Sequence, residues 1–330
     1  MTEQLTTADQ SLLKLIDSPD FKTQTCLADL GHYALLGVEG PDAAKFLQGQ
    51  VTCDVRELAN HVTRLGAQCS LKGRMLLSFR ALQRDEQRIL LRMHGGLIEK
   101  ALATFGKYIV FSKAKLVDHS AHYRRVGLHG PAAESLLRTT LGQVPEHIDE
   151  WVAAGDHLII KLDQQRYECW LAGDAEPVLA ALSQHTHPAA ENYWTLLDIR
   201  AGIGEVRPES DELFTPQSLN YQLVNAVNFR KGCYTGQEIV ARLHYRGTLK
   251  RHMQRFTFIA DEAALPLPGS TVNNSQGSAI GEIVMAAYAS PQRVEALVNI
   301  IDAQLTDAWL GHKKLEHLPL PYAIPSEENT

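Results

Sequence analysis

The sequence predicts an α+β protein with antiparallel sheets, followed by a small all-β domain. Strand-like runs alternate with helical ones over most of the chain, and many neighbouring strands are joined by short turns, which favours antiparallel pairing. From about Leu249 onward, short β-prone segments are separated by Pro, Gly, Asn and Ser, a pattern typical of a barrel or meander. The chain contains no GxGxxG and no GxxxxGK[ST] loop, so nothing indicates a dinucleotide or P-loop site.

Composition and charge narrow the class of protein. With 330 residues, 45% hydrophobic and 21% charged, the chain should form two or three globular domains. A net charge of -6 argues against a general nucleic-acid binder, which needs a basic face. The polar, acidic start is unlike a signal peptide, and no run approaches the roughly 20 apolar residues of a membrane span, so we expect a cytoplasmic protein.

The first elements form a pattern that recurs. After a short terminal helix, Tyr33–Val38 is β-prone, Gly40-Pro41 breaks the strand, and Asp42 can start a helix that ends near Gly49. A weaker copy lies 90 positions later, where Gly130-Pro131 stands in place of Gly40-Pro41. The sequence therefore predicts two related strand–turn–helix units that pack together.

The remaining elements before the all-β region follow in order. Strands are expected at Met75–Leu82, Arg88–His94, 157–162 and 166–173, and helices within 95–110 and 176–185. Trp194 stands at the start of a segment that is expected to be an amphipathic helix. A long polar loop then leads to the densest motif of the chain, RKGCYTGQEIVARLHYRG, which spans residues 230–247.

The five cysteines do not have the pattern of a disulfide framework or a zinc site. Their number is odd and no pair has CxxC spacing, which argues against disulfides and a zinc knuckle. Four of them stand among mixed or apolar neighbours and are expected to be small core side chains. They are Cys26, Cys53, Cys69 and Cys169.

Cys233 has different neighbours. Thr235 and Glu238 have the spacing of a capping box, which predicts a helix beginning at Gly236, with Cys233 just ahead of its positive end. Helix N-termini and nearby cations stabilise a thiolate, and Arg230 and Lys231 supply the cations. The other interpretation is a glycine-bounded turn that contains a half-buried thiol, and the local chemistry leaves both open.

The run KGCYTGQE resembles the signature of the YgfZ family of folate-binding, tRNA-modification-linked proteins, which share their fold with the aminomethyltransferase T-protein of the glycine cleavage system. FLQGQVTCDV (46–55), KGRM (72–75), KYIVFSK (107–113), FTPQSLN and LPLPY resemble the family in the same order, over roughly residues 25–325. The resemblance implies an N-terminal extension at 1–24, a T-protein-like folate-binding region of two interleaved α+β subdomains at 25–246, and a C-terminal β-barrel domain at 247–330.

The resemblance also implies a function. The family pattern is a three-domain ring with a central channel for tetrahydrofolate or a derivative, and a cytosolic role in maintaining iron–sulfur enzymes, including radical enzymes that thiomethylate tRNA. It makes Cys233 the functional thiol, and Trp194 and Tyr33 the folate contacts, although Tyr33 replaces a family tryptophan. The implied motif residues around the thiol are Lys231, Gly232, Tyr234, Thr235, Gly236, Gln237 and Glu238.

One departure from the T-protein pattern decides between enzyme and accessory protein. The catalytic acidic segment of T-proteins resembles GGIIDD, whereas Gly73–Ser78 contains no carboxylate. We therefore expect an accessory protein without independent catalytic activity; an enzymatic version would be tetrahydrofolate-dependent one-carbon transfer. No firm metal site is indicated, but the Cys233 thiolate could ligate iron or a cluster transiently, or take part in redox or one-carbon exchange.

Two alternatives stay open at this stage. The first is an aminomethyltransferase-like enzyme. The second is a direct tRNA-binding module built on the basic and aromatic stretch Arg242–Arg246 with Lys250-Arg251. Because of the net charge, we expect any effect on tRNA to act through the modifying enzymes, without direct contact with nucleic acid or membrane.

Overall fold

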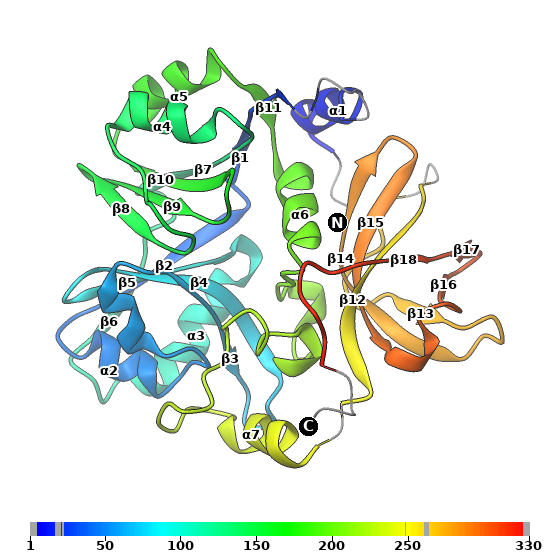
Figure 1. Cartoon of the computed structure of the whole chain (residues 1–330). Coiled ribbons are helices and arrows are strands. Elements are labelled where there is room, and N and C mark those ends of the chain that lie inside the picture. The colour runs from blue at the N-terminus through cyan, green and yellow to red at the C-terminus, as the bar shows by residue number, and fades with distance from the viewer. Residues whose placement is uncertain (1–4, 17–20, 22, 248, 261–263, 326–330) are drawn as a thin grey trace.

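The computed structural model describes residues 5–16, 21, 23–247, 249–260 and 264–325. They form two sheets in one half of the molecule, a barrel-like sheet in the other, and a helix between the halves (Figure 1). The predicted α+β class with a C-terminal barrel is confirmed. In the predicted N-terminal extension 1–24, residues 1–4, 17–20 and 22 lie outside the described residues. The three domain boundaries given above remain predictions.

The first sheet is antiparallel throughout, with the strand order β3-β4-β5-β2-β6. The strands expected near Tyr33, Met75 and Arg88 are confirmed, and the first helix ends at Gly49 as expected. The elements are β2 (Tyr33–Glu39), α2 (Ala43–Gln48), η2 (Val55–Asn60), β3 (Arg64–Cys69), β4 (Met75–Asp85), β5 (Arg88–His94), η3 (Gly95–Leu97), α3 (Ile98–Ile109) and β6 (Lys115–Asp118).

The second sheet repeats this plan, with the order β11-β1-β7-β10-β9-β8 and one parallel pair, β1 with β11. The predicted strands near His157 and Arg166 and the helix after Glu176 are confirmed. The elements are α1 (Thr7–Leu13), β1 (Cys26–Asp29), β7 (Tyr123–His129), α4 (Ala133–Leu141), β8 (Trp151–Ala154), β9 (His157–Lys161), β10 (Arg166–Ala172), α5 (Glu176–Ser183) and β11 (His187–Ala189).

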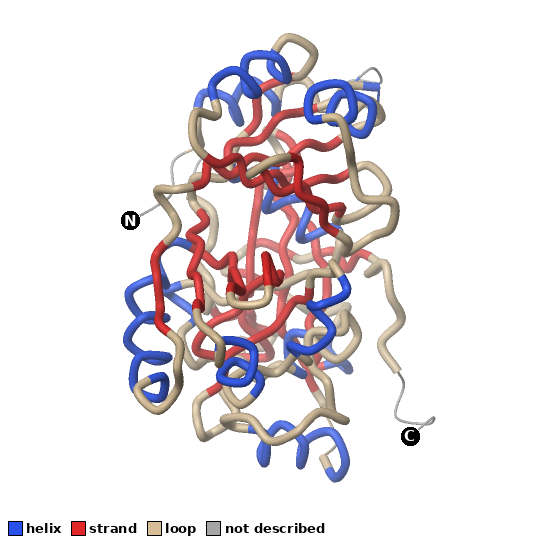
Figure 2. Tube along the Cα trace, turned by 90° about the vertical axis from the view of Figure 1, so that its left-hand side faces the viewer, coloured by secondary structure: helices blue, strands red, loops and turns tan. Residues whose placement is uncertain are grey.

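The third sheet contains seven strands in the order β17-β16-β13-β14-β15-β12-β18 and curls into a nearly closed barrel. In the perpendicular view most helices lie at the periphery and the strands toward the middle (Figure 2). Among the described residues, no helix has the length and apolarity needed to cross a bilayer. The strands are β12 (Arg251–Ile259), β13 (Thr271–Asn273), β14 (Ala279–Ser290), β15 (Arg293–Ile301), β16 (Trp309–Leu310), β17 (Lys313–Lys314) and β18 (Glu316–Leu318), with η6 (Asp302–Gln304) after β15.

The two predicted repeats are real, and they exchange strands. β2 with α2 and β7 with α4 occupy equivalent places in the two sheets, each beside three further antiparallel strands. The strand that precedes β2 in sequence, β1, pairs with β7, whereas β6, which precedes β7, pairs with β2. Each repeat therefore completes the sheet of the other. The strands of the first sheet all come from residues 33–118, whereas the second sheet combines β1 with strands from residues 123–189.

Two equivalent glycines make this exchange possible. Gly40 and Gly130 have φ angles of 130° and 135°, which side chains other than glycine rarely adopt. A Cβ at Gly40 would lie 2.3 Å from the backbone oxygen of Lys113, and one at Gly130 would lie 2.4 Å from that of Gln24. At both Gly-Pro turns, the residues just before the exchanged strand pack directly against the glycine backbone, where a side chain would not fit.

The helix between the halves is α6 (Glu191–Arg200), which follows β11 and packs against β14 and β1. The expectation of an amphipathic helix at Trp194 was wrong, because every residue from Asn192 to Ile199 is buried. Two-sided packing, on the sheets and on the barrel, removes the solvent-facing side that an amphipathic helix requires.

We expect Gly130→Ala to lower the melting temperature by about 5–10 °C, because the new methyl group meets backbone in a strained φ region. Gly106→Ala is the matched control. Gly106 lies in α3 with open space around the added Cβ, so the change should leave the melting temperature equal or slightly higher. Thermal unfolding followed by circular dichroism measures both, and equal melting for the two variants would contradict the close approach.

Candidate functional site

The loop that carries the motif is bound to the segment between α2 and η2. The Asn228 backbone N–H donates to the Thr52 carbonyl at 2.9 Å, and the Thr52 hydroxyl donates to the Ala226 carbonyl at 2.6 Å. Farther along, the Thr235 N–H donates to the Gly49 carbonyl at 3.2 Å. The loop is therefore fixed at both ends against one short stretch of the first repeat.

Lys231 fixes the middle of the loop. Its ammonium is buried and donates to the carbonyl oxygens of Val51, at 2.6 Å, and Cys53, at 2.8 Å, while it lies 5.1 Å from the ring centroid of Tyr234. Burial lowers the pKa of Lys231 to about 8. The expectation that Lys231 supplies a cation to the Cys233 thiol is therefore wrong: this ammonium is engaged in anchoring the loop.

The helix after the motif is α7 (Gln237–Arg246), and its start differs from the expectation. Thr235 does not cap it: Gly236 is the N-cap, with a φ of 83° and no side-chain capping bond. The Thr235 hydroxyl donates instead to the Gln50 side-chain oxygen at 3.4 Å. A Cβ at Gly236 would lie 2.5 Å from the Ser70 carbonyl oxygen, so close packing on the β3–β4 turn replaces the capping box.

Cys233 is the one exposed cysteine of the five. Beside it, Gly232 has open space where a side chain would stand. The other four thiols are buried, as predicted, and burial raises the pKa of Cys26 and Cys53 to about 11 and that of Cys69 to about 12. A partner molecule can therefore reach the Cys233 sulfur without unfolding the protein, and a thiol needs such access to react.

The structure brings together several of the sequence stretches that carried the resemblance. A Cβ at Gly73, in KGRM, would lie 2.9 Å from the Ile239 side chain of α7. Gln217, in FTPQSLN, donates its side-chain amide to the Val240 carbonyl at 2.5 Å. The Met75 N–H donates to the Phe214 carbonyl at 2.8 Å, so these stretches form one support for the thiol loop.

A cavity of about 610 Å³ adjoins the same loop. The Phe229 and His244 rings stack there at a centroid distance of 3.7 Å and an interplanar angle of 9°. The cavity carboxylates are paired with arginines, Asp54 with Arg56 and Glu57 with Arg64. The lining residues are Asp54, Glu57, Arg64, Asn225, Val227, Asn228, Phe229, Arg230, His244 and Tyr245.

Tyr33 and Trp194 lie in a second region, and one acidic residue connects them. The Tyr33 hydroxyl donates to Asp198 at 3.4 Å, and Arg166 donates to the other Asp198 oxygen at 2.8 Å. The Arg166 guanidinium lies 5.1 Å from the ring centroid of Trp194, and both aromatic side chains are buried. No contact between this region and Cys233 occurs among the described residues.

Sequence reasoning missed the charged partners of these aromatic residues. The Arg92 guanidinium lies 3.9 Å from the ring centroid of Tyr33 and forms a buried ion pair with Glu168, with 3.3 Å between nitrogen and oxygen. Burial raises the pKa of the Tyr33 hydroxyl. A usable signal was present, since Arg92 and Glu168 are charged residues inside otherwise apolar strands, where an unpaired charge is costly.

The polar atoms of this region test whether folate fits. The Trp194 indole N–H and one Glu168 carboxylate oxygen are buried and have no hydrogen-bond partner among the described residues. A small cavity of about 130 Å³ lies on the barrel side of α6, lined in part by Asp9, Glu191, Asn192, Thr195 and Arg207. An unpartnered donor and acceptor of this kind suit the edge of a pterin ring, but neither Trp194 nor Glu168 lines this cavity. The cavity is smaller than the roughly 300 Å³ of whole-ligand pockets, so it has room for only part of a folate.

No comparable fit exists for a resident metal. Among the residues that the structure describes, no group of three or more His, Cys, Asp or Glu side chains is arranged to hold an ion. Any iron bound at Cys233 would therefore need ligands from elsewhere.

Comparison with known proteins connects this geometry to a family. Residues 19–154 match the GCVT N-terminal domain. The chain is 31% identical over 229 residues to the tRNA-modifying protein YgfZ of Colwellia psychrerythraea, covering 69% of the chain and 70% of the relative. It is 31% identical over 320 residues to YgfZ of Edwardsiella ictaluri, covering 92% and 94%. The aminomethyltransferase T of Bartonella henselae superposes with a TM-score of 0.71 over 90% of this chain and 85% of that one. At 18% identity, this similarity shows a shared fold and nothing more.

The Lys231 anchor should give stability a specific pH dependence. Below pH 8 the ammonium is charged in both native and unfolded states; between about 8 and the ordinary 10.5 only the unfolded state keeps the proton, so this group's contribution to stability rises with pH. We expect the melting temperature of the wild type to rise relative to that of Lys231→Met between pH 7 and pH 10.

Lys250→Met, at an exposed position, is the control for this measurement. Its difference from the wild type should stay constant over the same pH range, because an exposed ammonium has the same environment before and after unfolding. A wild-type advantage over Lys231→Met that falls as pH rises would contradict the buried-ammonium assignment.

Proposed function

Because the chain belongs to the YgfZ family of tRNA-modifying proteins, we propose that it supports tRNA modification as a folate-binding accessory protein of iron–sulfur enzymes. The observation that carries the proposal is the combination at the motif: an exposed thiol on a loop held by a buried lysine and two backbone anchors. A loop built only as a connection would not need so many specific contacts to present one reactive side chain.

Folate is the ligand that the fold and the second region support best. The GCVT domain match and the T-protein fold make tetrahydrofolate or a derivative the expected molecule. Trp194 and Tyr33 are its proposed aromatic contacts. Both rings already lie beside guanidinium groups, so the pterin would use the unpartnered Trp194 N–H and Glu168 oxygen, and the Arg166 and Arg92 groups would hold the rings in place.

The thiol is the group that would act on a client protein. Cysteine thiolates are the usual ligands of iron–sulfur clusters, but a stable cluster needs about four of them. Cys233 supplies one, so transient ligation would need further ligands from a client protein, a second subunit or the nitrogen and oxygen atoms of a bound folate. The expected clients are radical enzymes that thiomethylate tRNA, and redox or one-carbon exchange at the same sulfur is the second route.

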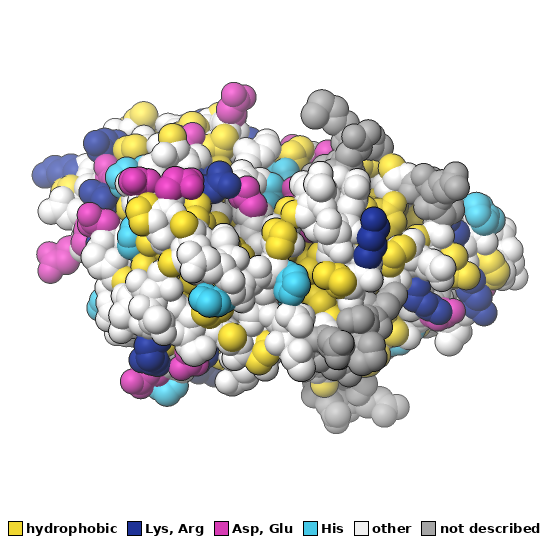
Figure 3. All heavy atoms as spheres, turned by 90° about the horizontal axis from the view of Figure 1, so that it is seen from above, with side chains coloured by type: hydrophobic (Ala, Val, Ile, Leu, Met, Phe, Trp, Pro, Cys, Tyr) yellow, Lys and Arg dark blue, Asp and Glu magenta, His cyan; other side chains and the backbone are white. Residues whose placement is uncertain are grey.

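One structural observation favours an accessory role over aminomethyl transfer, and the net charge of -6 argues against direct RNA binding. In the stretch where T-proteins carry an acidic residue, this chain has Ser78. Its hydroxyl accepts a hydrogen bond from the Val206 N–H at 2.7 Å, so it has a structural role. On the face seen from above, acidic and basic side chains are interspersed (Figure 3), whereas α7, which carries the basic stretch 242–246, lies at the opposite end of the molecule (Figure 1).

Tetrahydrofolate should quench the tryptophan fluorescence of the wild type. Trp194→Phe should remove most of the quenching, because the proposed contact involves that indole; Trp309→Phe, in the barrel strand β16, should leave it unchanged. Glu168→Gln should weaken the apparent affinity by about tenfold, the usual cost of a lost charged hydrogen bond. Wild type that shows no quenching would remove folate from the proposal.

Cys233→Ser should abolish the support of tRNA thiomethylation in a strain that lacks the gene for this protein. Serine keeps the size and the backbone of the exposed position, so the change tests the sulfur alone. Cys69→Ser, at a buried thiol, is the comparison. This change should lower the stability of the protein, so a lower growth temperature should restore thiomethylation for Cys69→Ser and not for Cys233→Ser. Thiomethylated nucleosides are measured by mass spectrometry of digested tRNA, and full rescue by Cys233→Ser would reduce the motif to a structural turn.

A further inference from the structure

The turn between α3 and β6 exposes apolar side chains that nothing in the proposed function uses. Phe111 is 93% exposed, the highest value among large apolar side chains of the described residues, and Val110 and Tyr108 are 70% and 43% exposed. We call these three residues the apolar patch. Single exposed apolar residues are ordinary, but three within four positions indicate an interaction surface.

The backbone beneath the patch is held firmly. The Lys113 N–H donates to the Asp42 carboxylate at 2.8 Å, and the Asp42 N–H donates back to the Lys113 carbonyl at 3.3 Å. Gly40 approaches the same carbonyl so closely that a Cβ there would lie 2.3 Å from its oxygen. The exposure of Phe111 is therefore fixed by the fold, and a partner would meet a pre-organised surface.

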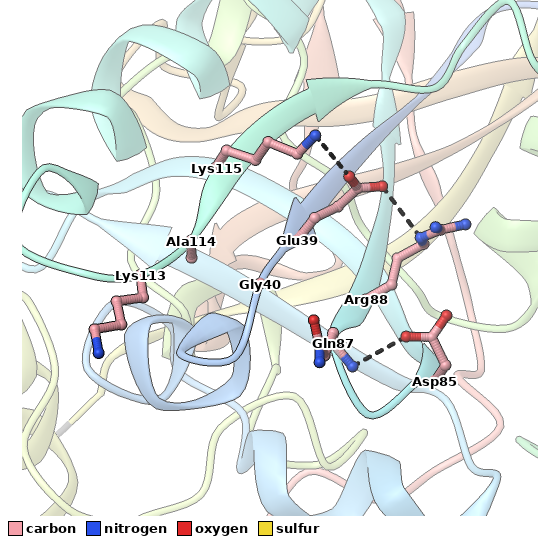
Figure 4. Close-up of a pocket in the computed structure, with 8 residues that line it drawn as sticks. All are labelled: Glu39, Gly40, Asp85, Gln87, Arg88, Lys113, Ala114 and Lys115. Carbon is pink, nitrogen blue, oxygen red and sulfur yellow. Dashed lines mark hydrogen bonds and ion pairs between the residues drawn. The ribbon is translucent and has the colours of Figure 1, made fainter.

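A cavity of about 380 Å³ adjoins the patch on the β6 side (Figure 4). Its lining contains more basic than acidic side chains. Glu39 pairs with Arg88 at 3.1 Å and with Lys115 at 3.4 Å, and Lys113 points away from that carboxylate. Neither Lys113 nor the exposed Lys107 forms an ion pair with any described residue. The patch is thus bordered by two lysines whose ammonium groups form no ion pair with a described residue.

One short helix, α2, connects the residues that contact the base of the patch with those that contact the thiol loop. α2 begins directly after Asp42, which holds Lys113, and ends at Gly49, whose carbonyl holds Thr235 of the motif. A helix of six residues is about 9 Å long. The backbone contacts of Lys113 and of Thr235 are therefore made at opposite ends of one short helix.

We propose that the apolar patch docks an acidic segment of a partner protein, with an apolar side chain of the partner against Phe111 and its carboxylates beside Lys107 and Lys113. This rests on the proposed function in taking the partner to be the tRNA-thiomethylating enzyme whose cluster Cys233 would serve. A protein segment fits better than a phospholipid surface, because it can place a side chain in the adjoining cavity of about 380 Å³, which a flat lipid surface would leave empty.

The test uses the full-length protein and the purified thiomethylating iron–sulfur enzyme encoded in the same genome, immobilised for biolayer interferometry. We expect wild type to bind with an affinity that falls as salt rises, and Phe111→Ser/Lys113→Glu to bind at least about tenfold more weakly, as for removal of an interface anchor. Ile259→Ser/Lys314→Glu is the matched control: it removes a 68% exposed apolar residue and reverses one exposed lysine on the barrel, and its binding should stay within about twofold of wild type.

Three results would overturn the docking site: no binding of wild type to the enzyme, equal binding of Phe111→Ser/Lys113→Glu, or patch-dependent binding to vesicles of anionic phospholipid in place of the enzyme. A cell assay separates this failure from failure of the proposed function. If wild type restores tRNA thiomethylation and the patch variant restores it equally, only the docking site fails. If wild type restores nothing, the proposed function fails, and the interferometry still decides the docking site.

Discussion

The structure depends on how the buried polar groups of α6 are satisfied. Residues 192–199 of this helix are buried between the two halves, so their polar groups need partners in the protein or in a ligand. The Asp9 carboxylate, from α1, accepts hydrogen bonds from the N–H groups of Ala190 and Asn192 at the start of α6. The Asn192 side chain bonds both backbone groups of Tyr288 in the barrel, so the polar residues of one helix join the N-terminal segment to the C-terminal domain.

The same requirement explains why charges lie inside the two-sheet half. Asp198 at the end of α6 must be paired, and it is paired with Arg166 of the second sheet and with the Tyr33 hydroxyl of the first. Removing Arg166 would leave the Asp198 charge buried without its ionic partner, which costs about 3–5 kcal/mol, whereas the intact ion pair adds little net stability. These groups therefore fix the relative positions of the two sheets more than they stabilise them, and that is the property a ligand site between the sheets needs.

The sequence was sufficient for the parts of the fold that local patterns determine. Apolar alternation and Gly-Pro turns predicted the strands, the repeat and the helix end at Gly49, because each depends on neighbours within a few residues. The start of α7 and the environment of α6 were predicted wrongly for the opposite reason. Gly236 packs against the Ser70 carbonyl, and Lys231 reaches the carbonyls of Val51 and Cys53, contacts that span more than 160 positions and have no local pattern. The exposure of Cys233 could be anticipated as one of two alternatives, but only the fold decides it.

One continuous stretch of chain relates the two regions of the site. β2 begins at Tyr33, beside Arg92 and Asp198, and leads through Gly40 into α2. The segment that follows α2 supplies the carbonyls that hold Lys231, and it is as firmly packed as the sheet itself. A continuous segment connects the proposed folate region with the thiol loop. Energetic coupling between these two regions would also require that both differ between two states of the protein. β6 pairs with β2 in the same sheet, and Lys113, just before β6, contacts Gly40, so this stretch is held at the point where the strand leads into α2. The strand exchange thus fixes the segment of chain that joins the proposed folate region to the thiol loop.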